Sequence, residues 1–314
     1  MTTSASGAAA PGSSGASAVS MDELFGRQSL GRAAVRFWRN NTQLCVGAGI
    51  ILLLILMALF GPLWVDPKGA QVGRAVVEQP PSLKYPLGTD TVGRQMLPVV
   101  IYGTPLTMRV GLMAGCIGLG VGILFGFIAG YYGGWIDNLL RGAADVFLTV
   151  PGLMILVVIA SSLHTALDVN TQALVVSTLA WMWPTRTIRS QVLTMRERTY
   201  IQVARLSGVS GLEIVFKEIL PNLLPYLAAS LVSAVSSAIL ASIGLEALGL
   251  GPQNEPTLGM TIYWAMYYTA LIRGLWWWWA PPIAIIVLVF IGLFLISAGL
   301  DQIANPRLRR VVEK

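Results

Sequence analysis

The sequence contains few charged residues and few of the residue types that build metal or nucleophilic sites. Only 11% of its 314 residues are Asp, Glu, Lys or Arg, against roughly 25% in an ordinary soluble domain. It has one histidine, and its two cysteines, Cys45 and Cys116, stand in separate apolar runs. This placement predicts buried thiols and argues against a disulfide or a metal site. An intramembrane enzyme would need a catalytic group set that these residues do not offer.

The sequence also contains no G-x-x-x-x-G-K-[ST] motif. Such a glycine-rich loop cradles ATP phosphates through its backbone N–H groups and its lysine. We therefore expect this chain to bind no cofactor, and any ATP-driven step to use a separate polypeptide.

Apolar residues dominate instead. They make up 55% of the chain, and the mean hydropathy is +0.68. Several runs approach the roughly 20 residues that cross a hydrocarbon core as a helix. We predict an all-α polytopic membrane protein with six transmembrane helices, at about Leu44–Trp64, Val110–Tyr132, Leu140–Leu163, Leu174–Ile188, Leu223–Leu248 and Trp278–Leu300.

The positions of the basic residues predict the orientation. Six of the 21 lysines and arginines fall in or beside the predicted outer segments, and the other fifteen fall in the inner ones. Because cytoplasmic loops are enriched in Lys and Arg, both termini are predicted to be cytoplasmic, in a cell membrane. The formal charge of +6 is then explained by basic residues that flank the lipid bilayer, and it gives no reason to expect a nucleic-acid partner.

The predicted organisation follows from these spans. Residues 1–20 carry no charge and no continuous apolar core, so we expect a disordered extension, with translation from Met21 as an alternative start. Four parts follow this extension: a cytoplasmic amphipathic segment with the first span (21–64), an extracytoplasmic segment (65–98), a transmembrane domain (99–304) and a cytoplasmic tail (305–314).

Gly118, Gly122, Gly126 and Gly130 recur every four residues in the second predicted span. Small residues at this spacing let helix backbones approach closely in lipid. We predict a helix-packing groove, with a surface that slides during transport as the alternative.

Two acidic residues lie near the ends of predicted spans, Asp145 in the third and Glu246 in the fifth. Ionisable groups at membrane depth face a partner or a wet cavity. Structural pairing and a position on the translocation path both remain open.

The run of four tryptophans at residues 276–279 precedes the last span. Tryptophan favours the membrane interface. An interfacial belt is the first interpretation, and a platform that stacks on sugars or aromatic peptide side chains is the second.

The segment 200–222, within a predicted cytoplasmic loop 196–222, is the most polar part of the middle of the chain. A helix over Tyr200–Ser207, a left-handed cap at Gly208 and a second helix over Gly211–Leu220 are predicted, with the fifth span beginning at Pro221. Together they would form a helical elbow at the cytoplasmic face.

Within it, "QVARLSGVSGLEIVFKEILPN" resembles the EAA loop of the membrane subunits of binding-protein-dependent ABC importers. Gln202, Val203 and Ala204 stand where the pattern has E-A-A, whereas Gly208, Ile214, Leu220, Pro221 and Asn222 fit. "YPLGTDTVGRQ", "AGYYGGWIDNLLRGAADVFLTVPGLM" and "NPRLRR" resemble segments of dipeptide and oligopeptide importer permeases of the second-subunit (DppC/OppC) type, with Gln95 and Asn305 each replacing Asp.

This resemblance implies a type I ABC importer (MetI-like) permease fold. It also implies a homologous permease partner, two cytoplasmic ATPase subunits or domains, and an extracytoplasmic solute-binding protein. The implied ATPase-coupling residues are Tyr200, Gln202, Ala204, Arg205, Gly208, Leu220 and Pro221.

Peptides are the first substrate class that the resemblance implies, with oligosaccharides or nickel chelates as the alternative. The segment "EPTLGMTIYWAMYYTALIRGLWWWWAPP" departs from the S-W-G-x-M wording of peptide permeases. A secondary transporter is the rival from another class, but it would normally place ionisable groups at the membrane midplane.

Overall fold

The computed structural model describes residue 38 and residues 41–163 and 167–304. The chain divides into a unit of residues Met1–Asn41 and a unit of residues Thr42–Lys314. All helices discussed below belong to the second unit. The predicted extension 1–20 and the predicted tail 305–314 lie outside the described residues.

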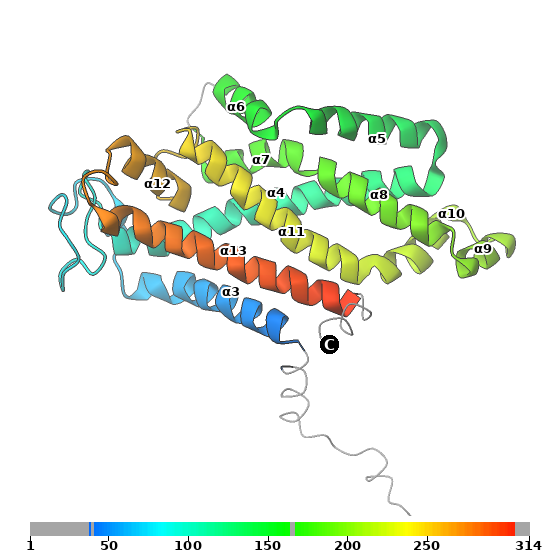
Figure 1. Cartoon of the computed structure of the whole chain (residues 1–314), viewed down its shortest axis with the longest axis horizontal. Coiled ribbons are helices and arrows are strands. Elements are labelled where there is room, and N and C mark those ends of the chain that lie inside the picture. The colour runs from blue at the N-terminus through cyan, green and yellow to red at the C-terminus, as the bar shows by residue number, and fades with distance from the viewer. Residues whose placement is uncertain (1–37, 39–40, 164–166, 305–314) are drawn as a thin grey trace, which may run out of the picture. The chain divides into compact units, whose positions relative to one another are not determined.

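The described part of the second unit is built from helices (Figure 1). Its pairing of extended backbone is limited, among the described residues, to one isolated bridge between Thr89 and Gln95. The helices are α3 (Thr42–Phe60), α4 (Met96–Tyr132), α5 (Gly134–Thr149), α6 (Gly152–Ser162), α7 (Val169–Ala180), α8 (Met182–Arg196), α9 (Thr199–Leu206), α10 (Gly211–Glu213), α11 (Leu220–Ala247), α12 (Leu258–Tyr267) and α13 (Trp276–Ala304), with 3₁₀ turns at Gly61–Leu63 and Pro67–Ala70 and a π-helical turn at Ile214–Ile219.

Four long helices of the described chain are apolar enough to cross a membrane: Thr42–Leu63, Met96–Tyr132, Gly211–Ala247 and Trp276–Ile303. A fifth span is possible if α5 and α6, which meet at an angle of 87°, count as one. The predicted fourth span, Leu174–Ile188, instead straddles two helices, because α7 ends at Ala180 and α8 begins at Met182. The all-α, multi-span architecture is confirmed, whereas the count of six is approximate.

Helix α4 begins 14 residues before the predicted start of the second span at Val110, at Met96. Proline inside a helix costs about 3 kcal/mol. The structure keeps Pro105 within α4. Met96 and Val99 are fully buried at the start of the helix, and this packing outweighs the local preference.

The four glycines of the predicted groove face α7 and α8. A Cβ atom built on Gly118 would lie 2.4 Å from the Ala180 Cβ, and one on Gly122 would lie 2.5 Å from the Pro184 Cβ. Gly126 and Gly130 meet Ile188 and Val192 in the same way, at 2.9 and 2.8 Å. The contacts thus advance by four residues on α4 and by four residues from Ala180 along α8. This contact, called the α4–α8 seam, brings the helix backbones close together from Gly118 to Gly130.

A second glycine contact joins α3 to α13, which lie side by side (Figure 1). A Cβ atom on Gly47 would lie 2.8 Å from the Ile296 nitrogen, and one on Gly299 would lie 2.6 Å from the Leu44 Cβ. The pairing of early with late residues makes the two helices antiparallel.

The prediction of two buried thiols is wrong. Both cysteines are free, Cys45 is half-buried, and Cys116 is exposed on α4. The reason is that apolar runs in a membrane protein also cover outward-facing surfaces, so an apolar neighbourhood in sequence does not imply burial inside the protein.

Replacing Gly122 with valine should destabilise the protein by about 1–3 kcal/mol, because overpacking forces the α4–α8 seam apart. Gly120 supplies the matched control on the same helix, since a Cβ atom there meets nothing within 4 Å. Thermal unfolding of both purified variants in detergent would measure the difference. Equal melting temperatures for Gly122→Val and Gly120→Val would show that the seam is not tight.

Candidate functional site

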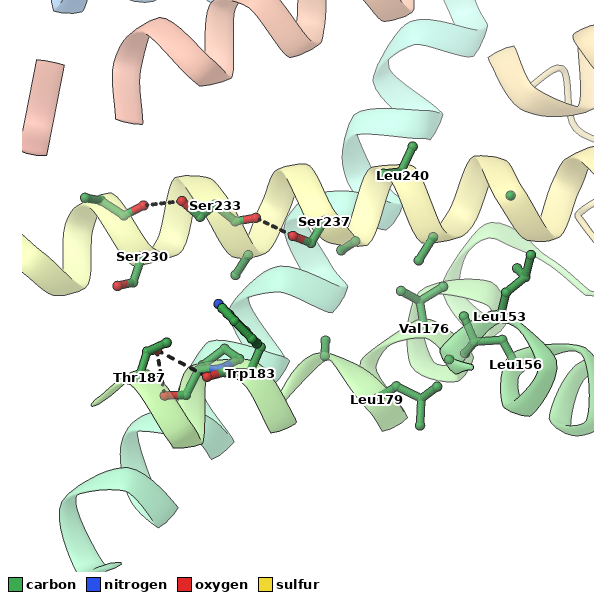
Figure 2. Close-up of a pocket in the computed structure, with 18 of the residues that line it drawn as sticks. Leu153, Leu156, Val176, Leu179, Trp183, Thr187, Ser230, Ser233, Ser237 and Leu240 are labelled. Atoms are coloured by element: carbon green, nitrogen blue, oxygen red, sulfur yellow. Dashed lines mark hydrogen bonds between the residues drawn. The ribbon is translucent and has the colours of Figure 1, made fainter. Parts of the chain in front are cut away.

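A cavity of about 740 Å³ opens along α11, opposite α6, α7 and α8 (Figure 2). Small residues line most of the α11 side, where Ser230, Ser233 and Ser237 follow one another along the helix. The opposite wall carries Trp183 and Thr187 of α8. The rest of that wall is apolar, with Leu153 and Leu156 of α6 and Val176 and Leu179 of α7.

Neither acidic residue that the sequence pointed to lines this cavity. The lining instead includes Asp301 of α13. Sequence analysis missed Asp301 because it ended the last span at Leu300, whereas α13 continues to Ala304. The signal that could have found it is an acidic residue directly after a long apolar run.

Asp145 of α5 lies in a group of ion pairs between α5 and α8. Its carboxylate is 3.5 Å from Arg186 and 3.9 Å from Arg141. One turn further along α8, Arg189 donates to Asp137 through its Nη2 at 2.6 Å. The pairs with Arg186 and Arg189 tie α5 to α8, whereas Arg141 lies on α5 itself.

Glu246 is fully buried near the end of α11. Its carboxylate accepts hydrogen bonds from Gln172 at 2.8 Å, Thr257 at 2.8 Å and Ser242 at 3.1 Å. Gly259 makes room for it, since a Cβ atom there would lie 2.1 Å from a carboxylate oxygen. Glu246 therefore joins α7, α11 and the start of α12, away from the cavity.

The elbow takes the predicted form up to Gly208. Helix α9 ends at Leu206, and Gly208 has φ +82°. The N–H groups of Gly208 and Val209 donate to the carbonyls of Arg205 and Ala204 at 3.1 and 3.2 Å. A Cβ atom on Gly208 would meet nothing within 4 Å, so the glycine is required by its left-handed conformation and not by space.

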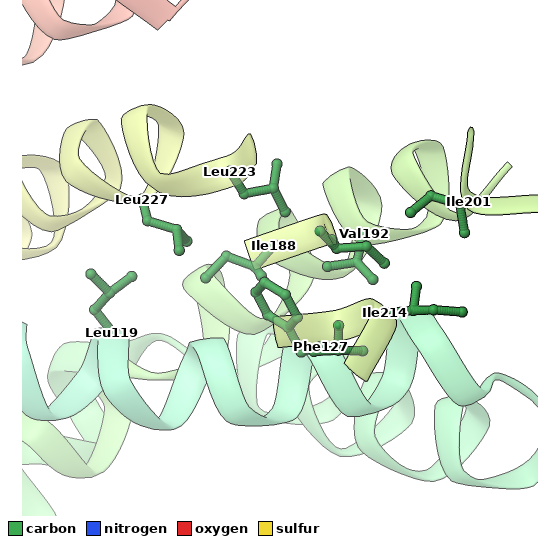
Figure 3. Close-up of a cluster of buried hydrophobic side chains, with 10 residues drawn as sticks. Leu119, Phe127, Ile188, Val192, Ile201, Ile214, Leu223 and Leu227 are labelled. Atoms are coloured by element: carbon green, nitrogen blue, oxygen red, sulfur yellow. The ribbon is translucent and has the colours of Figure 1, made fainter. Parts of the chain in front are cut away.

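The inner face of the elbow is anchored in a buried cluster (Figure 3). Ile201 of α9 and Ile214 of the π turn are fully buried there. They pack beside Ile188 and Val192 of α8 and Phe127 of α4. Burying one such side chain contributes about 1.5–3 kcal/mol, so the elbow is held firmly against α8 and α4.

The outer face of the elbow is exposed and largely apolar. Leu206 is 88% exposed, and Val203 is 56% exposed. The predicted coupling residues divide between exposed and half-buried positions: Tyr200, Gln202, Arg205, Gly208 and Pro221 are exposed, and Ala204 and Leu220 are half-buried. The neighbouring apolar residues Leu212 and Phe216 are exposed as well.

Helix α11 begins at Leu220, one residue before the predicted start of the fifth span at Pro221, but the helical backbone continues without a break from Gly211 to Ala247. The chain enters α11 through a π turn, in which the Leu220 N–H donates to the Val215 carbonyl five residues earlier. Proline has no N–H to donate. The wider π turn accommodates it without ending the helix.

At the opposite end of the bundle, the "GTDTVGR" stretch folds around a buried carboxylate. Asp90 accepts hydrogen bonds from the backbone N–H groups of Val92 and Arg94 at 3.0 and 2.7 Å and from the Arg94 side chain at 2.6 Å. Gly93 takes φ +76° in this turn. The stretch thus closes the segment 65–95, called the outer segment after its predicted location, before α4 begins.

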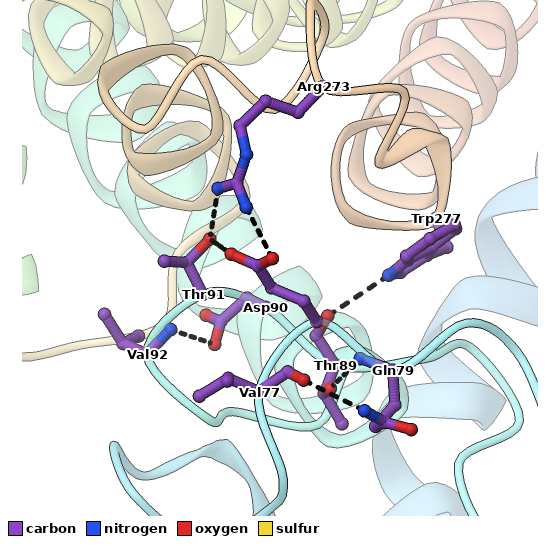
Figure 4. A network of polar contacts seen from close by, with 9 residues as sticks. Val77, Gln79, Thr89, Asp90, Thr91, Val92, Arg273 and Trp277 are labelled. Atoms are coloured by element: carbon purple, nitrogen blue, oxygen red, sulfur yellow. Dashed lines mark hydrogen bonds and ion pairs between the residues drawn. The ribbon is translucent and has the colours of Figure 1, made fainter.

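Side chains from the turn between α12 and α13 hold this segment in place (Figure 4). Arg273 donates to Glu78 at 2.5 Å and to Thr91 at 3.4 Å, and the Trp277 indole N–H donates to the Thr89 carbonyl at 3.1 Å. The hydrogen bond from Arg273 lowers the pKa of Glu78; burial opposes this shift.

The tryptophan run does not form the simple interfacial belt that was predicted. Trp278 is fully buried, and its ring stacks on Tyr268 with centroids 6.0 Å apart. Trp277 packs against the outer segment, whereas Trp276 is 54% exposed. The rings of Trp277 and Trp278 fill the space in which α12, α4 and the outer segment meet.

Replacing Glu246 with alanine should cost about 3–5 kcal/mol, because three buried donors would lose their acceptor. Glu246→Gln keeps an oxygen for two of them and should retain most of the stability. Thermal unfolding would compare the two variants. Equal destabilisation would mean that charge, and not hydrogen bonding, matters at this position.

The Glu78–Arg273 pair should stabilise the outer segment only above acidic pH. Because the folded-state pKa of Glu78 is lowered, the contribution is fully present above the unfolded pKa of about 4.3. It is lost as the pH falls through the folded value. Both side chains are partly exposed, at 40% for Arg273 and 28% for Glu78, so about 0.5–1 kcal/mol is expected. Thermal unfolding would compare the wild type with Arg273→Met at neutral and acidic pH. The wild type should melt at a higher temperature at neutral pH, and this difference should disappear in acid. A difference that does not change with pH would refute the contribution of the pair.

Comparison with known proteins places this geometry in a family. Residues 122–310 match the model of the binding-protein-dependent transport system inner membrane component. The chain is 31% identical over 279 residues to the dipeptide transport system permease protein DppC of Alkalihalophilus pseudofirmus, covering 88% of this chain and 90% of that protein. It is 30% identical over 243 residues to the oligopeptide transport system permease protein OppC of Mycobacterium tuberculosis, covering 77% and 82%.

A solved structure with the same fold is that of the MetNI methionine ABC transporter in inward-facing conformations. It matches with a TM-score of 0.56 and 19% identity, over 67% of this chain and 97% of the matched chain. The family match covers more than half of this chain and the relatives are matched over most of their length. The chain therefore belongs to the inner membrane components of binding-protein-dependent transport systems.

Proposed function

We propose that this chain is the membrane-spanning permease subunit of an ATP-driven importer that translocates di- and oligopeptides delivered by a solute-binding protein. The single observation that carries the proposal is the elbow, which combines a buried inner face with an exposed apolar outer face. Apolar side chains that remain exposed at the end of a helical bundle are suited to a partner protein.

The elbow is proposed to dock on a cytoplasmic ATPase. Its basic residues, Arg196, Arg198, Arg205 and Lys217, support a cytoplasmic location. The start of α3 and the end of α13 lie toward the same end of the bundle (Figure 1), which supports cytoplasmic termini. Because Ile201 and Ile214 pack on α8, a push on the elbow would move α8 with it.

The cavity is proposed to be one half of the translocation path. It opens on α11, α8 and α6, and a homologous permease subunit would supply the other wall. A solute-binding protein would approach the opposite end, where the outer segment is fixed to α12 and α13.

Peptides are proposed as the substrate because the relatives reported above are named as dipeptide and oligopeptide permeases. Oligosaccharides and nickel chelates remain the alternative. Uptake of a labelled tripeptide, an oligosaccharide and a nickel chelate by vesicles that contain the whole complex would decide between them. Uptake of the peptide alone is expected, and uptake of only another class would refute this part of the proposal.

Replacing Leu206 with aspartate should weaken ATPase binding and reduce transport at least tenfold, because a charge would enter the apolar docking face. The protein should still insert and fold, since Leu206 is 88% exposed. Leu83→Asp is the matched control, because Leu83 is fully exposed in the outer segment. Co-purification of the ATPase and vesicle uptake would measure both effects. Normal ATPase binding and uptake by Leu206→Asp would remove the coupling role of the elbow.

A further inference from the structure

The cavity wall carries a negative charge and no positive one. Asp301 is the only Asp or Glu among the described residues that line it, and no Lys, Arg or His of the described chain is part of the lining. Its carboxylate is exposed and has no hydrogen-bond or ion-pair partner within the described residues. A charged group on an apolar helix is costly unless it faces water or a ligand. Asp301 is therefore available to a cation in the cavity.

The hydroxyl groups of the wall present acceptors to the cavity. Ser233 donates to the Ala229 carbonyl at 3.2 Å, and Ser237 donates to the Ser233 carbonyl at 3.0 Å. Thr187 donates in the same way to α8 carbonyls at 3.2 Å. A hydroxyl has one proton and two lone pairs. Because the protons of Ser237 and Thr187 bond their own helices, their lone pairs remain for a donor in the cavity, whereas the Ser233 hydroxyl also contacts the Ser297 hydroxyl at 3.2 Å.

An indole ring projects into the same space. Trp183 is 64% exposed and points from α8 toward the serines of α11 (Figure 2). Trp181, two residues earlier, is engaged instead, because its indole N–H donates to the Thr178 carbonyl at 2.8 Å and its ring packs on Phe125. The face of an exposed indole attracts cations.

We propose that Asp301 and Trp183 make this wall selective for solutes that carry a protonated amine, such as the free amino terminus of a peptide. A carboxylate, an indole face and hydroxyl acceptors all favour an ammonium group, and none of them favours an anion. The proposal rests on the peptide-permease function proposed above and assigns it a charge preference inside the membrane.

The test uses the complete transport complex in vesicles, with trialanine and N-acetyl-trialanine as probes. The solute-binding protein is loaded to the same occupancy with each peptide, as checked by equilibrium dialysis, so that the binding step does not select. The wild type should transport trialanine faster. Asp301→Asn should reduce the ratio of the two rates about fivefold, and Trp183→Leu should reduce it about two- to fivefold.

Asp66→Asn is the matched control, because Asp66 is an exposed acid in the outer segment, away from the cavity; it should leave the ratio unchanged. Asp301→Glu and Trp183→Phe should preserve most of the preference.

If the complex with Asp301→Asn does not assemble, the comparison of Trp183→Leu with Trp183→Phe still tests the proposal. An unchanged ratio in the assembled variants, or equal loss of both substrates, would overturn the charge preference while leaving the permease function intact. Failure of the wild type to transport either peptide would instead overturn the proposed function.

Discussion

The close contact between α4 and the α7–α8 pair determines where the other functional parts lie. Four glycines of α4 meet residues at the same four-residue spacing on the facing helices, from Gly118 at Ala180 to Gly130 at Val192. In lipid, helices gain little from hiding apolar surface from each other, so contact distance controls how strongly they associate. This seam fixes the rotation of α8 about its axis and so decides which of its faces meet the cavity and the elbow.

Helix α8 connects the two sites because it presents different residues to each. Trp183 and Thr187 face the cavity, whereas Ile188 and Val192 belong to the buried cluster that anchors the elbow. A close-packed interior transmits displacement because it compresses little. The cavity and the elbow are thus joined by one rigid element, and a movement imposed at one end of α8 changes the lining at the other.

The sequence predicted the features that depend on local backbone chemistry. Gly208 must adopt a positive φ, and the glycines of α4 repeat on one helix face, so both were visible as patterns. Features that depend on contacts between distant residues were not visible. Glu246 has partners on α7 and at the residue before α12, and no spacing rule links Gln172 with Thr257. Apolar content also misplaced the ends of spans, since tertiary packing extends α4 through Pro105.

The two ends of the bundle are stabilised by different means, and this difference suits their proposed partners. The outer segment is fixed by directional hydrogen bonds, including those to Asp90, Thr89 and Glu78. The elbow is fixed chiefly by apolar contacts around Ile201 and Ile214. Hydrogen bonds lose strength steeply with misalignment, whereas apolar contact is non-directional. The outer end therefore keeps one arrangement, whereas the elbow shares its apolar cluster with α8 and α4 and moves together with them.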